Sequence, residues 1–176
     1  MFILVNVSKY IKIPSVKMMT QEPHLFCLYL QQDDPKKNTI MRLTKFNLVK
    51  IGKRLHQFPK KAIILDPFSD REISSLDHGQ IAKFGIIVID CSWEQIDTIF
   101  NRKFPTGRRL PHLLAANTVN YGKWDRLSSA EALAAGLYIG GFPKKAQEIL
   151  NVFKWGPAFW NINQDFFSQK KTRYYS

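Results

Sequence analysis

The sequence predicts an α/β fold in which a mostly parallel sheet carries helices on both faces. The first observation is the run Phe84–Ile89, which is almost wholly apolar and rich in β-branched residues. Such a run is typical of a strand that is buried on both faces, as in a parallel sheet covered by helices. The second observation is that three residue pairs have the spacing of a helix-capping box. These pairs are Ser69 with Glu72, Ser92 with Gln95, and Ser128 with Glu131.

The amino-terminal part of the chain supplies one strand, one polar turn and one short helix. Leu25–Leu30 is predicted to be a buried strand, and the polar residues 31–39 then form a turn. Ile40–Leu48 is predicted as a short helix that begins near Asn38 and Thr39. The start of this helix is either an anion or carboxylate site, or simply a helix end capped by Thr39. Residues 1–21 are weakly patterned, and a start at Met1, Met18 or Met19 stays open.

A change of pattern near residue 65 predicts a boundary between two parts of the chain. Ala62–Leu65 is a short apolar strand that ends at Asp66 and Pro67, and the Ser69 capping box then opens a short helix. We therefore expect a small basic α+β subdomain over residues 1–65, and a second domain over residues 66–176. In the second domain the strand at Phe84–Ile89 is followed by a helix from Trp93 to about Phe100.

The carboxyl-terminal part is predicted to be mainly helical. Leu110–Ala116 is a short apolar segment, and an amide-rich loop follows it at Asn117–Gly122. Ala130–Tyr138 is rich in alanine and predicts a helix that ends at the glycines after it. Lys144–Phe153 predicts a final amphipathic helix. The aromatic residues after it are expected to join the core: Trp155, Phe159, Trp160, Phe166 and Phe167.

The point where the strand Phe84–Ile89 ends is the first candidate site. Asp90 and Trp93 place a carboxylate and an indole where a buried strand leads into a helix. In open α/β sheets, ligands bind at this carboxyl end of the strands. A purely structural role, with Asp90 capping the helix and Trp93 packing against it, has about equal weight on these residues alone.

The charge of the chain favours a polyanionic partner. Lys and Arg number 26 against 14 acidic residues, which gives a net charge of +12 and a pI near 9.8. Nucleic acid is the partner that this excess favours first, and an anionic membrane surface is second. A loop with four cations around Phe104 suits a nucleic-acid backbone and a stacked base. The candidate RNA-binding residues are Lys36, Lys37, Lys53, Arg54, Lys60, Lys61, Arg102, Lys103, Arg108 and Arg109.

Other classes of protein are disfavoured by what the sequence lacks. The two cysteines, Cys27 and Cys91, form no CxxC pair, and the four histidines are scattered, so we expect no disulfide framework and no metal. The carboxylate of Asp90 beside Cys91 disfavours a reactive thiolate. No apolar run approaches the roughly 20 residues of a membrane span. A reducing cytoplasm is the expected location.

Several motifs, taken in order, resemble one known family. They are Asp90-Cys91-Ser92-Trp93, Arg109–Asn117, Asn120-Tyr121-Gly122 and Leu127–Ala135. Together with the Asp-Pro-Lys turn before Thr39, they make residues 25 to 165 similar to the small-subunit rRNA aminocarboxypropyltransferases. Three positions differ from the family pattern: Ile40 replaces a frequent glycine, Thr118 a frequent proline, and Trp124-Asp125 a frequent Pro-Tyr pair.

The resemblance implies both a fold and a reaction. The fold would be SPOUT-like, with a carboxyl-terminal trefoil knot, in a protein that acts as a monomer. The donor would be S-adenosylmethionine, whose 3-amino-3-carboxypropyl group moves to N3 of a pseudouridine, N1-methylated or unmodified, in small-subunit rRNA. Two alternatives stay open: a SPOUT-type RNA methyltransferase, and a non-catalytic basic factor that binds rRNA during ribosome assembly.

The resemblance also implies roles for particular residues. Thr39 would bind the amino-acid end of the cofactor, and Asp90 would lie at the reacting end. Trp93 would pack near the sulfonium methyl group and so leave the aminocarboxypropyl arm facing the RNA. The other cofactor-binding residues implied are Ile89, Leu110, Leu113, Asp125 and Ser129.

Overall fold

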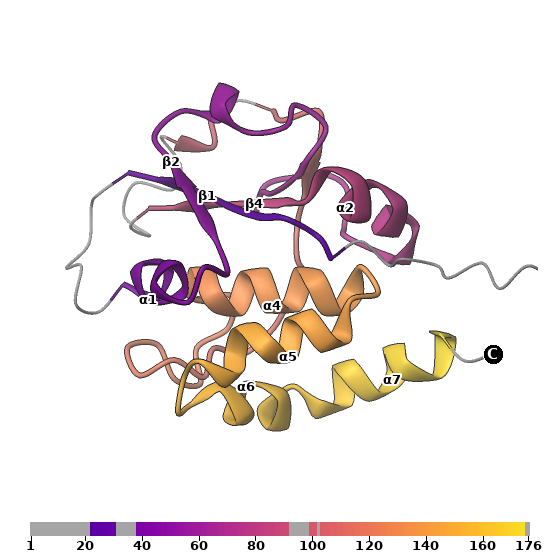
Figure 1. Ribbon diagram of the computed structural model, residues 1–176. Helices are drawn as coiled ribbons and strands as arrows, with labels where there is room; N and C mark the ends of the chain where they lie inside the picture. The colour runs from indigo at the N-terminus through magenta and orange to yellow at the C-terminus, as the bar shows by residue number, and fades with distance from the viewer. Residues whose placement is uncertain (1–21, 31–37, 92–98, 102, 175–176) are drawn as a thin grey trace, which may run out of the picture.

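The fold is built on one parallel sheet of five strands. A computed structural model describes residues 22–30, 38–91, 99–101 and 103–174. The order across the sheet is β2-β1-β4-β3-β5, and every neighbouring pair is parallel. Figure 1 shows the strands in one layer above a layer of helices. The strands are β1 (Leu25–Tyr29), β2 (Lys50–Gly52), β3 (Ile63–Leu65), β4 (Ile86–Asp90) and β5 (Gly107–Arg108).

Helices cover one face of this sheet and form the larger core with it. Because side chains alternate along a strand, Cys27 of β1 and Val88 of β4 both point into this core. Helix α4 packs on β4, with Gly136 close to the sheet: a Cβ there would lie 3.3 Å from Leu65. In Figure 1, α5 lies beside α4, with α6 and α7 beyond it. The helices of this layer are α1 (Thr39–Lys45), α4 (Ser129–Ile139), α5 (Pro143–Asn151), α6 (Gly156–Ile162) and α7 (Gln164–Tyr174).

A smaller apolar cluster covers the opposite face. Phe26 of β1 and Ile87 of β4 point to this side, where they meet Phe58 and Phe100. Phe58 directly follows the short 3-10 helix η1 (Leu55–Gln57). The helix predicted from Trp93 to Phe100 lies mostly outside the described residues, because these omit positions 92–98. Helices on both faces therefore stay a prediction, whereas the parallel sheet with helices on one face is confirmed.

Most of the predicted elements are present near their predicted limits. The strands at residues 25–29 and 63–65 are confirmed, as are the helices at residues 39–45, 129–139 and 143–151. The strand predicted from Phe84 begins instead at Ile86, because Phe84 ends helix α2 (His78–Phe84). Gly85, with a φ of 86°, then reverses the chain between this helix and β4.

The helix predicted from Ser69 is wrong. The Ser69 hydroxyl donates to the Gly107 carbonyl at 2.9 Å, and the amide of Ile73 donates to the Arg109 carbonyl at 3.0 Å. The segment is therefore held without a helix against β5 and the residue after it. The capping box forms a few residues later, where Ser74 and Asp77 enclose the 3-10 helix η2 (Ser75–Asp77) just before α2.

The boundary predicted near residue 65 falls inside this single sheet. β4 lies between β1 and β3, so strands from both sides of residue 65 share hydrogen bonds. Among the described residues, no helix combines the length and the apolar character that crossing a bilayer requires.

Candidate active site

Two helices begin at the carboxyl edge of the sheet, where β1 and β4 end together. Tyr29 and Asp90 are register partners at the last position of these two parallel strands. Helix α1 begins at Thr39 after the cap residue Asn38, and α4 begins at Ser129 after the cap residue Ser128. Backbone amides at the start of a helix carry a partial positive charge, so this edge favours acidic groups.

The carboxylate of Asp90 joins the beginnings of both helices. Asn38 donates from Nδ2 to one oxygen at 2.6 Å, and the Ser129 hydroxyl donates to the other oxygen at 2.5 Å. The Asn38 side chain also caps α1, because its Oδ1 accepts from the amides of Ile40 and Met41. Thr39 adds a third connection, since its Oγ1 accepts from the amide of Ala130 at 3.3 Å. Asp90 is buried, so these contacts fix its position tightly.

A pocket of about 360 Å³ opens beside this junction. Its floor is formed by the ends of β3 and β4, including Leu65 and Ile89. The chain after β5 supplies Leu110, and the first turns of α4 supply Ser129 and Ala132. Ser129 thus contacts the pocket and the Asp90 carboxylate together. The volume lies within the range of pockets that hold small ligands.

Charged side chains line the pocket as well as apolar ones. Burial raises the pKa of Asp66, although the amide of Phe68 donates to its carboxylate and partly opposes that effect. Glu72 lies 3.5 Å from the Arg109 guanidinium. On the far wall, His112 and Asp125 are paired at 2.7 Å. The pocket therefore combines three carboxylates with apolar walls.

Glu131 fixes the loop that encloses one side of the pocket. It is fully buried, and its Oε1 accepts from the amides of Ala116 and Asn117 at 2.6 and 3.0 Å. Its Oε2 accepts from the Asn117 side chain, and from both the amide and the hydroxyl of Ser128. One carboxylate thus holds the chain before α4 and the loop after Leu110 in fixed relation.

The cofactor residues implied by the sequence lie in three different environments. The pocket lining includes Ile89, Leu110, Asp125 and Ser129. Thr39 and Asp90 lie next to it through their bonds to the first turn of α4. Leu113 is fully buried in the main core, although its amide donates to Asp125 at 3.3 Å. Trp93 lies outside the described residues.

The predicted RNA-binding residues also separate into groups. Lys53, Arg54, Lys60 and Lys61 are exposed, whereas Lys36, Lys37 and Arg102 lie outside the described residues. Lys103 is exposed and forms an ion pair with Asp70 at 2.9 Å, which lowers the pKa of Asp70. Arg109 lines the pocket.

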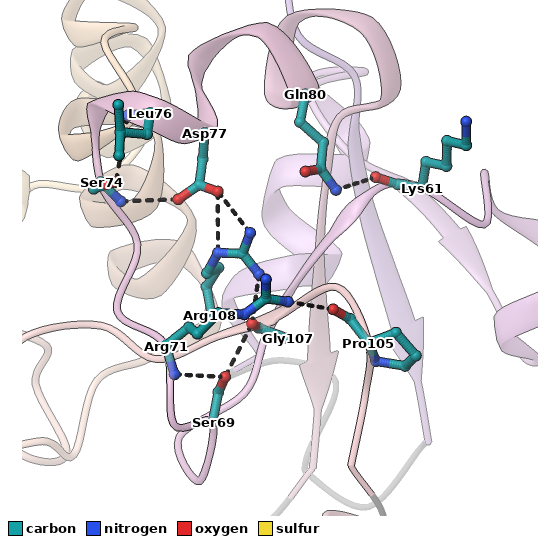
Figure 2. A network of polar contacts seen from close by, with 10 residues as sticks. All are labelled: Lys61, Ser69, Arg71, Ser74, Leu76, Asp77, Gln80, Pro105, Gly107 and Arg108. Atoms are coloured by element: carbon teal, nitrogen blue, oxygen red, sulfur yellow. Dashed lines mark hydrogen bonds and ion pairs between the residues drawn. The ribbon is translucent and has the colours of Figure 1, made fainter.

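Arg108 differs from the other cations because it is buried. Its guanidinium contacts the buried Asp77, with Nη2 and Nε at 2.9 and 3.0 Å from one carboxylate oxygen. Figure 2 shows this pair between β5 and the turn that begins η2, where the Ser74 amide donates to the other oxygen of Asp77. The pair joins β5 to α2, and burial leaves Arg108 little access to a phosphate.

Sequence reasoning missed several pocket residues. Asp66 and Pro67 directly follow the carboxyl end of β3, and Asp90 lies at the carboxyl end of β4. The rule that ligands bind at the carboxyl ends of strands, which identified Asp90, would therefore have identified them too. Glu72 and His112 gave no such signal, because each reaches the pocket only through the folded path of the chain. Within the described ranges, no group of three or more His, Cys, Asp or Glu side chains has a geometry that could hold a metal ion.

Comparison with known proteins places this architecture in a family. Residues 63–174 match the family model described as "Ribosome biogenesis protein, C-terminal". A 16S rRNA aminocarboxypropyltransferase of Methanosphaera stadtmanae is 45% identical over 134 residues, which cover 75% of this chain and 78% of the relative. The enzyme of the same name from Thermoplasma acidophilum is 43% identical over 143 residues, covering 81% and 86%.

A solved structure agrees with these relatives. The SAM-dependent rRNA:acp-transferase Tsr3 from Vulcanisaeta distributa superposes with a TM-score of 0.80 at 39% identity, over 85% of this chain and 83% of that one. Sequence and fold therefore agree over most of both chains. This chain belongs to the 16S rRNA aminocarboxypropyltransferase family.

Proposed function

We propose that this protein transfers the 3-amino-3-carboxypropyl group of S-adenosylmethionine to small-subunit rRNA during ribosome biogenesis. The observation that carries the proposal is the pocket at the carboxyl edge of the sheet, which adjoins the fixed carboxylate of Asp90 through Ser129. The family membership supports the same reaction, since the relatives carry its name.

The residues of the pocket fit this donor. S-adenosylmethionine carries a positive sulfonium and a positive ammonium group, and the pocket offers the carboxylates of Asp66, Glu72 and Asp125. Leu65 and Leu110 provide apolar surface for the nucleoside. Thr39, at the beginning of α1, is the group assigned to the amino-acid end.

The donor supplies a sulfonium with three activated carbons, so the protein selects the product by geometry. The pocket walls, together with Trp93, hold the methyl group away from the RNA and leave the aminocarboxypropyl methylene facing it. Positioning of this kind can lower the barrier to the selected transfer by several kcal/mol. The acceptor is N3 of a pseudouridine, either N1-methylated or unmodified. Asp90 accepts its proton or orients the base. This role is supported by the bonds from Asn38 and Ser129, which fix the position of its carboxylate.

The proposal extends to the RNA surface and to the topology. Residues 1–65 act as the RNA-binding part, with Lys53, Arg54, Lys60 and Lys61 exposed on it. The insertion of β4 between β1 and β3 supports a SPOUT-like knotted topology. The enzyme acts as a monomer.

The mass of the modified nucleoside separates this function from its alternatives. Small-subunit rRNA is incubated with the protein and S-adenosylmethionine, digested to nucleosides and examined by mass spectrometry. We expect a uridine-type nucleoside heavier by one aminocarboxypropyl group. A nucleoside heavier by only a methyl group would indicate a methyltransferase. Unmodified RNA together with no calorimetric binding of S-adenosylmethionine would indicate a non-catalytic assembly factor.

A further inference from the structure

The loop at residues 117–126, here called the aromatic loop, exposes large apolar side chains to solvent. Tyr121 is 64% exposed and Trp124 is 61% exposed, and Val119 beside them is 68% exposed. Clustered exposure of large apolar side chains is typical of an interaction site, whereas single exposed residues are ordinary. The proposed transfer of the aminocarboxypropyl group uses none of these three side chains.

Hydrogen bonds hold the backbone of the aromatic loop in one conformation. The Asn117 side chain accepts from the amides of Val119 and Asn120 at 3.1 and 3.0 Å, and Glu131 holds Asn117 itself. Leu114 and Trp124 form an antiparallel bridge, flanked by bonds from Ala115 to Lys123 and from Asp125 to Leu113. Exposed rings on a fixed backbone lose little conformational entropy on binding a partner.

The aromatic loop borders the proposed cofactor pocket. Asp125 lies within the loop and lines the pocket. His112, which precedes the loop in the sequence, and Leu127, which follows it, also line the pocket. Asp125 holds a positive φ of 58° and accepts from the amide of Leu113, which fixes the turn directly after Trp124. Trp124 is therefore the direct neighbour in sequence of a residue that lines the pocket.

The charges beside the rings indicate which partner they fit. Lys123 and Arg126 are exposed and flank Trp124 on either side in the sequence. The chain as a whole carries +12. Aromatic rings between cations are the arrangement by which proteins hold unpaired nucleotides, with bases stacked on the rings and phosphates on the cations.

We infer that the aromatic loop binds unpaired nucleotides that flank the acceptor base, with Tyr121 and Trp124 stacking on bases and Lys123 and Arg126 contacting phosphates. The inference rests on the proposed function, because it takes RNA as the substrate. It adds a second contact surface to the basic residues of the amino-terminal part. It also explains how one loop orients the acceptor relative to the pocket.

Fluorescence anisotropy without cofactor tests the inference separately from catalysis. The probes are a labelled oligouridylate and a labelled RNA duplex of equal length, at one fixed salt concentration. We expect Trp124→Ala and Tyr121→Ala each to weaken oligouridylate binding roughly tenfold, because each removes one stacked base. Duplex binding should change less than twofold, and Trp124→Phe should restore most of the affinity. Leu76→Ala removes another large apolar side chain, 93% exposed in η2, and serves as the control with wild-type affinity.

Steady-state kinetics then separate a role in RNA contact from a structural one. Trp124→Ala should raise the KM for small-subunit rRNA and leave the dissociation constant of S-adenosylmethionine unchanged. Equal oligouridylate affinity in wild type, Trp124→Ala and Tyr121→Ala would overturn the inference and assign the rings to a protein partner. A wild-type protein that binds oligouridylate through these rings but transfers no group would instead refute the proposed function alone.

Discussion

At the scale of single residues, Asp90 is both a structural link between helices and the group proposed to act on the acceptor base. Its carboxylate accepts from Asn38 and Ser129, so it holds the beginnings of α1 and α4 at the end of β4. The bond from the Ser129 hydroxyl, at 2.5 Å, lies in the range of strong, charge-assisted contacts between a hydroxyl and a carboxylate. Asp90 thus links the beginnings of two helices that are distant in the sequence, whereas most of the helix that the sequence allows it to cap lies outside the described residues.

Replacing Asp90 with asparagine tests its chemical part while preserving its size. An amide cannot accept the proton of the acceptor nitrogen, so Asp90→Asn should lower kcat by about 10²-fold or more. The dissociation constant of S-adenosylmethionine, measured by calorimetry, should change by less than about threefold, because Asp90 is not part of the pocket lining. Asn38→Ala removes a donor to Asp90 without altering the pocket lining, so it is the control for the structural tie and should keep most of kcat. Unchanged turnover in Asp90→Asn would remove this residue from the mechanism.

Asp66 gives a prediction about pH. Burial raises its pKa in the folded state above the ordinary value near 3.8, so the folded protein binds a proton there more tightly than the unfolded chain does. This stabilising contribution is present at low pH, and it disappears as the pH rises through the raised pKa. Asp66→Asn should therefore increase the free energy of unfolding at neutral pH, measured by urea denaturation, and this gain should vanish in strong acid. A variant with equal stability at neutral pH would contradict the burial argument.

At the scale of elements, the start of α4 shows what a capping motif predicts and what it does not. The spacing of Ser128 and Glu131 predicted the helix start, and both halves of the capping box are formed. The same glutamate also holds Ala116 and Asn117, which lie 14 or 15 residues earlier in the chain. No local sequence pattern predicts the contacts of Glu131 with Ala116 and Asn117, because they depend on the path of the intervening loop.

Removing the charge of Glu131 should therefore destabilise the protein more than the removal of a cap would. In Glu131→Gln an amide nitrogen replaces one carboxylate oxygen, so the groups that donate to that oxygen lose their acceptor. We therefore expect a decrease of about 2–4 kcal/mol in the free energy of unfolding. Urea denaturation monitored by circular dichroism measures this decrease. Glu148→Gln is the matched control, because Glu148 is exposed and forms an ion pair with Lys145 at 2.7 Å. That pair should contribute less than about 1 kcal/mol. Equal decreases in the two variants would show that Glu131 acts as an ordinary cap.

Other elements show why local signals also mislead. Ser69 and Glu72 have the spacing of a capping box, yet Ser69 donates to Gly107 and Glu72 forms a bridge with Arg109. Sheet contacts made some 37 residues away thus override a local helix signal. Arg108 belongs to a basic run, yet the buried Asp77 pairs with it. The charge pattern identified a cationic segment correctly but could not tell its buried member from its exposed ones.

At the scale of the whole molecule, the net positive charge makes RNA binding depend on the salt concentration. The net charge of +12 predicts binding that weakens steeply as salt displaces the protein from phosphates. The sign of this effect follows from the sequence alone, whereas the number of cations that can reach phosphates depends on the fold. The sequence also predicted the parallel sheet, because apolar strands buried on both faces occur in few other architectures. The shape of the pocket required the fold, since its residues come from several segments that are far apart in the sequence.

A variant with four substitutions measures how much the amino-terminal cations contribute to RNA binding. Replacing Lys53, Arg54, Lys60 and Lys61 by alanine should reduce the slope of log K against log salt by about 3, at roughly 0.7–0.9 for each phosphate that the variant no longer neutralises. Binding of small-subunit rRNA is measured between about 50 and 200 mM salt, the range over which such slopes are steep. A variant with the wild-type slope would assign RNA binding to other cations.

The central claim is that the aminocarboxypropyl group, and not the methyl group, leaves the sulfonium for the RNA. Isotope transfer tests this claim most directly. Two parallel reactions contain the protein, small-subunit rRNA and S-adenosylmethionine labelled either in the carboxyl carbon or in the methyl group. We predict that RNA acquires label only from the carboxyl-labelled donor. Label acquired from the methyl position, with none from the carboxyl carbon, would contradict the account.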